Sequence, residues 1–292
     1  MKRNDILSTT AAVWVNPVRD TKCPGQFFNS KLLLHISNGV KSFINLFYPL
    51  SCYICHAKLS PLKDMPLCDH CWQEIRLNPP PSCRKCGIHL PAFSQKEAHF
   101  CKKCQTSSYY FKKASSACIY EGIVKKCVHL FKYKRKLALA KPLSRLLVDF
   151  TYNFIDIKKI DLIVPVPLHP KKFRQRQFNQ ARILAQAVSS AFAGRLEDKA
   201  LVKIKDHPAQ ANLSQAKRIN NVQNSFRVKN LPAVKDKNIL LIDDVLTTAA
   251  TVNECAKVLW EAGAKTIEVL TLARTERYFP ARSGNGPYKK TG

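Results

Sequence analysis

Two adjacent carboxylates, Asp243 and Asp244, follow a run of four apolar residues at positions 239–242. Such a run is typical of a buried parallel strand, because both faces of a parallel sheet are covered. Carboxylates at the end of a strand could accept hydrogen bonds from the vicinal hydroxyls of a sugar. We therefore expect a sugar-containing ligand at the end of this strand.

Small and hydroxyl-bearing residues separate the acidic pair from a predicted helix that begins near position 252 and stops at Gly263. These loop residues are Thr247, Thr248, Ala249, Ala250 and Thr251. Loop amides and the positive end of a helix can hold a phosphate, so the acids and the loop together predict a ribose-phosphate site. The alternative is an ordinary strand–turn–helix with Asp as the N-cap, which does not require two acids and three threonines.

Eight of the twelve cysteines form four Cys-x-x-Cys pairs, which favour metal binding in a reducing compartment over disulfides. The pairs are Cys52 and Cys55, Cys68 and Cys71, Cys83 and Cys86, and Cys101 and Cys104. Two pairs can converge on one tetrahedral zinc ion. The connecting segments, 56–67 and 87–100, suit ribbon hairpins, so sequential pairing predicts two closed, structural zinc sites. Interleaved pairing and a single occupied site are the alternatives.

Two basic stretches accompany these motifs. Residues 123–136 combine cations with Phe131 and Tyr133, which could stack nucleobases, although a solvated basic helix face would look the same. The candidate nucleic-acid contacts are Lys132, Tyr133, Lys134, Arg135 and Lys136. The second stretch follows an apolar strand at 160–164, where ligands bind in open α/β sheets. We expect this stretch to be a loop, and its cations Lys171, Lys172, Arg174 and Arg176 could pair with diphosphate oxygens.

The acidic pair with its loop and the basic stretch after the strand at 160–164 each resemble a motif of a known protein family. Residues 239–251 are similar to the phosphoribosyl diphosphate (PRPP) motif of type I phosphoribosyltransferases, with Ala249 where that family has Gly. Residues 174–180 resemble the Arg-x-Arg-Gly-Phe-Asn-Gln element of the ComF family, with Gln177 in place of Gly. Further matches to ComF proteins are Lys132, Tyr133, Gln210, Leu213, Arg218, Asn221, Phe226 and Arg274.

The ComF resemblance implies a role in natural competence, with DNA uptake, single-stranded DNA and proteins of the uptake machinery as partners. It implies PRPP binding with magnesium at the acidic pair, the 247–251 loop, Arg174 and Arg176, and a mobile loop containing Gln210 and Arg218. The alternative is a salvage phosphoribosyltransferase that uses PRPP and magnesium. The sequence leaves open whether any transfer is catalysed, and to which acceptor.

Composition is consistent with this interpretation. The 292 residues carry a formal net charge of +28, which suits a polyanionic partner. No run of eighteen apolar residues predicts a membrane span, and the N-terminus is a poor signal peptide, so we expect a cytoplasmic protein.

We expect a type I phosphoribosyltransferase-like α/β fold, a parallel sheet flanked by helices, preceded by a small cysteine-rich zinc-ribbon module. The expected divisions are an N-terminal tail with an amphipathic helix at 1–45, a double zinc ribbon at 46–108, the phosphoribosyltransferase-like domain at 112–279 and a C-terminal tail at 280–292. The helix could lie on a membrane surface or pack on the next domain.

Overall fold

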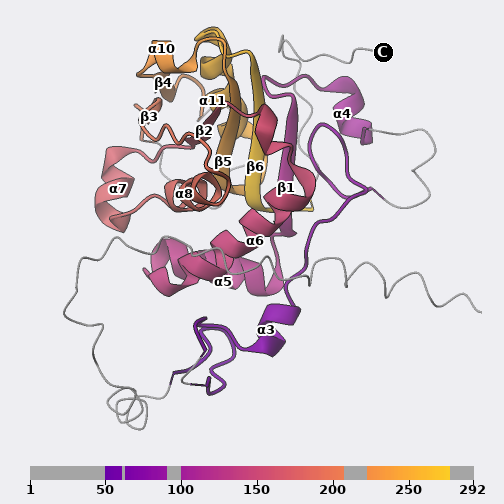
Figure 1. Ribbon diagram of the computed structural model, residues 1–292, viewed down its shortest axis with the longest axis vertical. Coiled ribbons are helices and arrows are strands. Elements are labelled where there is room, and N and C mark those ends of the chain that lie inside the picture. Colours follow the sequence, from indigo (N-terminus) through magenta and orange to yellow (C-terminus); the bar gives the residue numbers. More distant parts are fainter. Residues whose placement is uncertain (1–49, 61–62, 91–99, 207–221, 277–292) are drawn as a thin grey trace, which may run out of the picture.

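A four-stranded parallel sheet forms the centre of the molecule in a computed structural model that describes residues 50–60, 63–90, 100–206 and 222–276 (Figure 1). Its strand order is β1-β6-β5-β2, and every neighbouring pair is parallel. The strands are β1 (Lys113–Ile119), β2 (Leu162–Pro165), β5 (Asn238–Leu246) and β6 (Thr266–Arg274). The predicted tails, the amphipathic helix, Gln210 and Arg218 lie outside the described residues.

Side-chain alternation along β5 divides the core into two layers. Ile239 and Leu241 pack in one cluster with residues of α11 (Ala250–Glu261). Leu240 and Ile242 pack in the other with residues of α5 (Gly122–Tyr133) and further helices. Because both faces are covered, the strand is apolar from Ile239 to Ile242, and the predicted parallel sheet flanked by helices is confirmed.

The remaining elements cover the sheet and its ends. The longer helices are α6 (Ala140–Phe154) and α8 (Gln180–Phe192), and α7 (Pro170–Arg176) precedes α8. The short elements are α3 (Asp69–Gln73), α4 (Lys102–Thr106), α10 (Leu231–Val234), the antiparallel pair β3 (Leu201–Lys203) and β4 (Phe226–Val228), and 3₁₀ turns at Leu137–Leu139 and Ile157–Lys159.

Two segments differ from the sequence interpretation. The strand expected to end at position 242 continues through both carboxylates to Leu246, because β6 pairs with it along its whole length. The basic stretch expected to be a loop is the helix α7, since the side chain of His169 caps it and Pro170 stands in its first turn.

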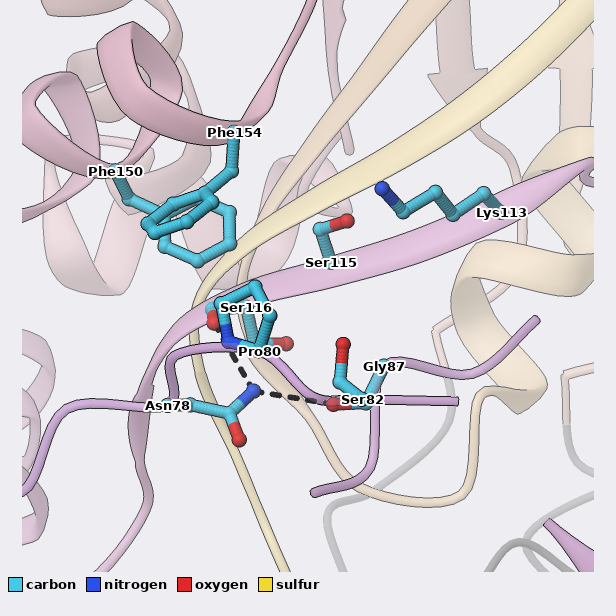
Figure 2. A pocket seen from close by; sticks show the side chains of 9 residues that line it. All are labelled: Asn78, Pro80, Ser82, Gly87, Lys113, Ser115, Ser116, Phe150 and Phe154. Carbon is cyan, nitrogen blue, oxygen red and sulfur yellow. Dashed lines mark hydrogen bonds between the residues drawn. The ribbon is translucent and has the colours of Figure 1, made fainter. Parts of the chain in front are cut away.

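The cysteine-rich region lies along the outer edge of β1. The Asn78 amide donates to the carbonyl of Ala117, and the Ile119 amide donates to Arg76. Figure 2 shows the side chain of Asn78 between β1 and the cysteine-rich segment that contains Gly87. Its Nδ2 donates to the carbonyls of Gly87 and Ser116 at 3.1 Å each. These contacts cover an edge that would otherwise expose unpaired backbone groups.

Gly87 makes this close approach feasible. Its φ is +69°, and a Cβ at this position would lie 2.5 Å from the carbonyl oxygen of Ala114. Any larger residue would push the ribbon away from β1. Phe150 and Phe154 of α6 lie near Pro80 and line the same small pocket (Figure 2).

No helix in the described part of the chain combines the length and apolar character needed to cross a bilayer.

Two non-glycine residues adopt the left-handed backbone at the positions where the resembling families have glycine. Ala249 has φ +58° directly before α11, and Gln177 has φ +64° at the end of α7. A side chain in this region is strained by its own Cβ, so the fold holds both turns at a local cost.

We predict that Ala249→Gly raises the free energy of unfolding by about 0.5–1 kcal/mol, because glycine removes the strain but adds unfolded-chain entropy. Chemical denaturation measures the change. The matched control is Ala256→Gly within α11, which should be destabilising by a similar amount. A loss of stability in Ala249→Gly would contradict the strain.

Candidate functional site

The acidic pair lies between the two layers of the core. Along β5, Asp243 continues the row of Leu241 on the α11 side, and Asp244 continues the row of Ile242 on the α5 side. There Lys132 of α5 meets Asp244, with Nζ 2.7 Å from Oδ2 and 2.8 Å from Oδ1. The two side chains are only 17% and 12% exposed, so this ion pair is well shielded from water.

The pKa values around the pair are shifted. Burial and the neighbouring charge of Asp244 raise the pKa of Asp243 to about 7. Burial alone would lower the pKa of Lys132, but the charge and hydrogen bond of Asp244 outweigh it, so that the pKa is raised. Asp243 is therefore about half protonated at neutral pH, and a bound cation or hydroxyl donors would favour its ionised form.

The loop after β5 is fixed at both ends. The amide of Thr275 donates to the carbonyl of Leu246 at 3.1 Å, which ties the loop to the end of β6. At the other end, Thr248 Oγ1 accepts from the amide of Ala250 at 3.4 Å, where α11 begins. The Thr247 side chain is exposed, so its hydroxyl is accessible at the helix N-terminus. Amides and hydroxyls in this arrangement can bind a phosphate.

A cationic cavity of about 430 Å³ adjoins the acidic pair. Lys132 lines this cavity and also forms the ion pair with Asp244. Its lining consists of five cations, one acid and two further side chains: Lys132, Arg135, Lys171, Lys172, Arg176, Asp206, Tyr133 and Gln175. The excess of positive charge favours an anionic ligand with several phosphate oxygens.

Asp206 is the one acid of this cavity. His169 Nδ1, Lys171 Nζ and Lys172 Nζ each lie 3.9 Å from one of its carboxylate oxygens. Burial and the charge of Lys203 lower the pKa of Lys172. The sequence interpretation missed Asp206, since a single acid before the 207–221 segment carries no signal of its own.

The structure brings most predicted ligand residues together, with a difference at one position. Arg176 lines the cavity, whereas Arg174 is exposed and is not among the lining residues. The loop 247–251 lies at the end of β5 beside the acids.

The residues of the predicted nucleic-acid surface differ in exposure. Tyr133 is 56% exposed, and the guanidinium of Arg176 lies 4.9 Å from its ring centre. Lys136 Nζ lies 4.8 Å from the ring centre of Tyr53, next to the first cysteine pair. The stacking role predicted for Phe131 is wrong, because this side chain is 1% exposed in the core.

The cysteines form two groups of four, as sequential pairing predicts. In each group the sulfurs lie within 4.8 Å of one another: Cys52, Cys55, Cys68 and Cys71 (the first tetrad), and Cys83, Cys86, Cys101 and Cys104 (the second tetrad). The Cys55 and Cys68 sulfurs are 3.5 Å apart, and those of Cys86 and Cys101 are 3.8 Å apart. Sulfurs at about 2.3 Å from a tetrahedral zinc are about 3.8 Å apart, so both tetrads fit structural zinc.

We predict two zinc ions per chain and unequal effects of ligand substitutions. Cys101→Ser should lower the melting temperature of the whole chain, because the second tetrad packs in one cluster with β6 and α11. Cys55→Ser removes an exposed ligand and should cost one zinc with a smaller loss of stability. Elemental analysis and calorimetry measure both effects. A zinc content near zero in reduced wild-type protein would contradict the assignment.

We also predict that Asp243→Asn stabilises the ligand-free protein increasingly as pH rises from 5.5 to 8. A carboxyl whose pKa is raised to about 7 binds more protons in the folded than in the unfolded chain, so wild-type stability falls over this window. Removing the charge should recover about 1–3 kcal/mol at pH 8. Urea unfolding at several pH values is the measurement, and a gain independent of pH would refute the shifted pKa.

Two family models match the chain. The double zinc ribbon domain matches residues 43–107, and the phosphoribosyl transferase domain matches residues 179–283. Among solved structures, the allosteric regulatory enzyme of purine biosynthesis is 19% identical, with 46% of this chain and 26% of that chain covered. Its TM-score is 0.32.

Curated relatives match over most of the chain. DNA utilization protein YhgH of Escherichia coli (strain K12) is 29% identical over 235 residues, covering 78% of this chain and 98% of the relative. Competence protein F of Haemophilus influenzae is 28% identical with the same coverage. Competence protein ComFC of Streptococcus pneumoniae is 26% identical, covering 71% and 86%. The chain thus combines a double zinc ribbon with a phosphoribosyl transferase domain and is a homologue of competence protein F, ComFC and YhgH, which confirms its resemblance to the ComF family.

Proposed function

We propose that this protein is a competence-related DNA-handling factor of the cytoplasm that binds magnesium PRPP and single-stranded DNA on overlapping surfaces. The observation that carries the proposal is the shared cavity. Lys132 contacts Asp244 of the PRPP-like motif, and the same cavity is lined by Tyr133 and Arg135 of the candidate DNA surface. The homologues named competence protein F and DNA utilization protein support a role in DNA uptake, with uptake-machinery proteins as partners.

PRPP offers three groups that the site residues could hold. Asp243 and Asp244 would accept hydrogen bonds from the ribose hydroxyls, and the 247–251 loop would bind the 5′-phosphate. Lys171, Lys172 and Arg176 would neutralise the diphosphate. Arg174, which is exposed on α7, would add positive charge outside the cavity. Magnesium would bind diphosphate oxygens and screen their charge.

The DNA surface extends from the cavity toward the first tetrad. Tyr133 offers an exposed ring for stacking, and Lys134, Arg135 and Lys136 follow it at the end of α5. Arg135 Nη2 donates to the carbonyl of Gln175 at 2.8 Å, which joins this end of α5 to α7. Contacts of this kind bind phosphates without reading sequence, so we expect little sequence preference.

Nucleotide salvage is the competing function, because the phosphoribosyl transferase domain could transfer ribose phosphate to a base. A net charge of +28 and two cysteine tetrads have no evident use in salvage. Pyrophosphate release from PRPP, measured with free bases and with single-stranded DNA, distinguishes the two and decides whether any transfer occurs.

We predict that magnesium PRPP raises the melting temperature by several degrees. A ligand at 100 times its Kd adds about 2.7 kcal/mol, and each kcal/mol is worth about 2–4 °C in a chain of this size. Asp243→Asn with Asp244→Asn should abolish the shift, whereas Lys125→Gln with Lys126→Gln, exposed residues of α5 outside the cavity, should preserve it. Lack of any response to millimolar PRPP would exclude PRPP as the ligand.

We predict that affinity for an oligonucleotide falls steeply with salt. The slope of log affinity against log salt is about −0.7 per phosphate contact on single strands, so replacing Lys134, Arg135 and Lys136 by Gln should flatten it by about 2. Fluorescence anisotropy across a salt series measures the slope, with Lys125→Gln and Lys126→Gln as the control. Absence of binding at low salt, together with transfer to a free base, would favour salvage.

A further inference from the structure

Arg274 is a fully buried cation at the end of β6, with 0% of its surface exposed. Its guanidinium reaches into the second tetrad rather than toward solvent. Nη1 donates to the carbonyl oxygen of Cys86 and also lies 3.8 Å from the Cys86 sulfur, within hydrogen-bond range of a thiolate. Nε donates to the carbonyl of Thr275 at 3.2 Å, which fixes the plane of the group.

The zinc chemistry of the tetrad explains a buried guanidinium here. Four thiolates around one zinc ion carry two net negative charges, and burying them away from water is costly unless cations lie nearby. Lys85, between two of the ligands, is also buried at 7% exposure, with Nζ 6.0 Å from the ring centre of Tyr109. The surroundings of this tetrad therefore contain positive charge that the fold fixes in place.

The first tetrad has a different environment. All four cysteines of the second tetrad are buried, whereas Cys55 is exposed and Cys68 is half-buried in the first. Because of this exposure, both water and a chelator can reach the first tetrad. In the described part of the chain, no arginine or lysine donates a hydrogen bond to a sulfur of the first tetrad.

We propose that Arg274 is a positioning residue of the second zinc centre. Its two contacts hold the Cys86 ligand and offset the thiolate charge, so that this centre retains zinc while the first exchanges it. The inference is independent of the proposed ligands, because it concerns zinc retention alone.

The test measures zinc release from the full-length, zinc-loaded protein to an excess of a coloured chelator. Wild type should release one zinc rapidly and one slowly, and Cys55→Ser should lack the rapid phase. Arg274→Met should accelerate the slow phase by about 10–100-fold, the usual effect of losing an outer partner of a metal ligand, and leave the rapid phase unchanged. Arg76→Met is the matched control, since Arg76 pairs with Glu121 and Glu276 but is 59% exposed.

Cobalt substitution separates a ligand effect from general loosening of the fold. Removing an N–H···S contact should shift the thiolate-to-cobalt charge-transfer band of the second centre, which a merely structural role would not do. If Arg274→Met does not fold, Arg274→Lys keeps the charge and should give intermediate release with a shifted band. Unchanged slow release and an unchanged cobalt spectrum in the folded variant would overturn the proposal, as would equal release from both centres of wild type.

Discussion

The ion pair between Lys132 and Asp244 is the interaction on which the candidate site depends. It joins α5 to the end of β5, and it gives one of two adjacent carboxylates a buried counter-charge. Without that charge, two acids side by side would protonate or repel, as the raised pKa of Asp243 already indicates. The same contact brings the cationic end of α5 close to the acids, so the cations of α5 and the carboxylates of β5 lie together at one edge of the sheet.

The cysteine-rich region contributes to this edge from the other side. The second tetrad packs in one cluster with the sheet, and Arg274 connects its Cys86 to the end of β6. The next residue, Thr275, donates to Leu246 immediately before the 247–251 loop. One short path of contacts therefore leads from a zinc ligand to the candidate phosphate loop, and the ribbon is part of the framework that fixes the loop.

Local patterns in the sequence predicted the strand, the loop and helix that follow it, and both tetrads, because each is encoded within a short segment. The backbone is left-handed at positions 177 and 249, the two places where this chain lacks the Gly of the families it resembles. Phe131 was misassigned because it lies in a basic stretch, whereas helical periodicity places it in the core with Val124, Cys127 and Val128. The place of Asp206 in the cavity and the contact of Arg274 with Cys86 depend on segments that are distant in sequence, so no local pattern predicts them.

A calorimetric titration of magnesium PRPP, with and without a saturating oligonucleotide, tests the central claim most directly. Because Lys132, Tyr133 and Arg135 line the cavity and belong to the candidate DNA surface, the two ligands should compete. The oligonucleotide should weaken PRPP binding, and PRPP should weaken oligonucleotide binding by the same factor. Independent binding of the two ligands, or no PRPP binding in either titration, would contradict a shared site.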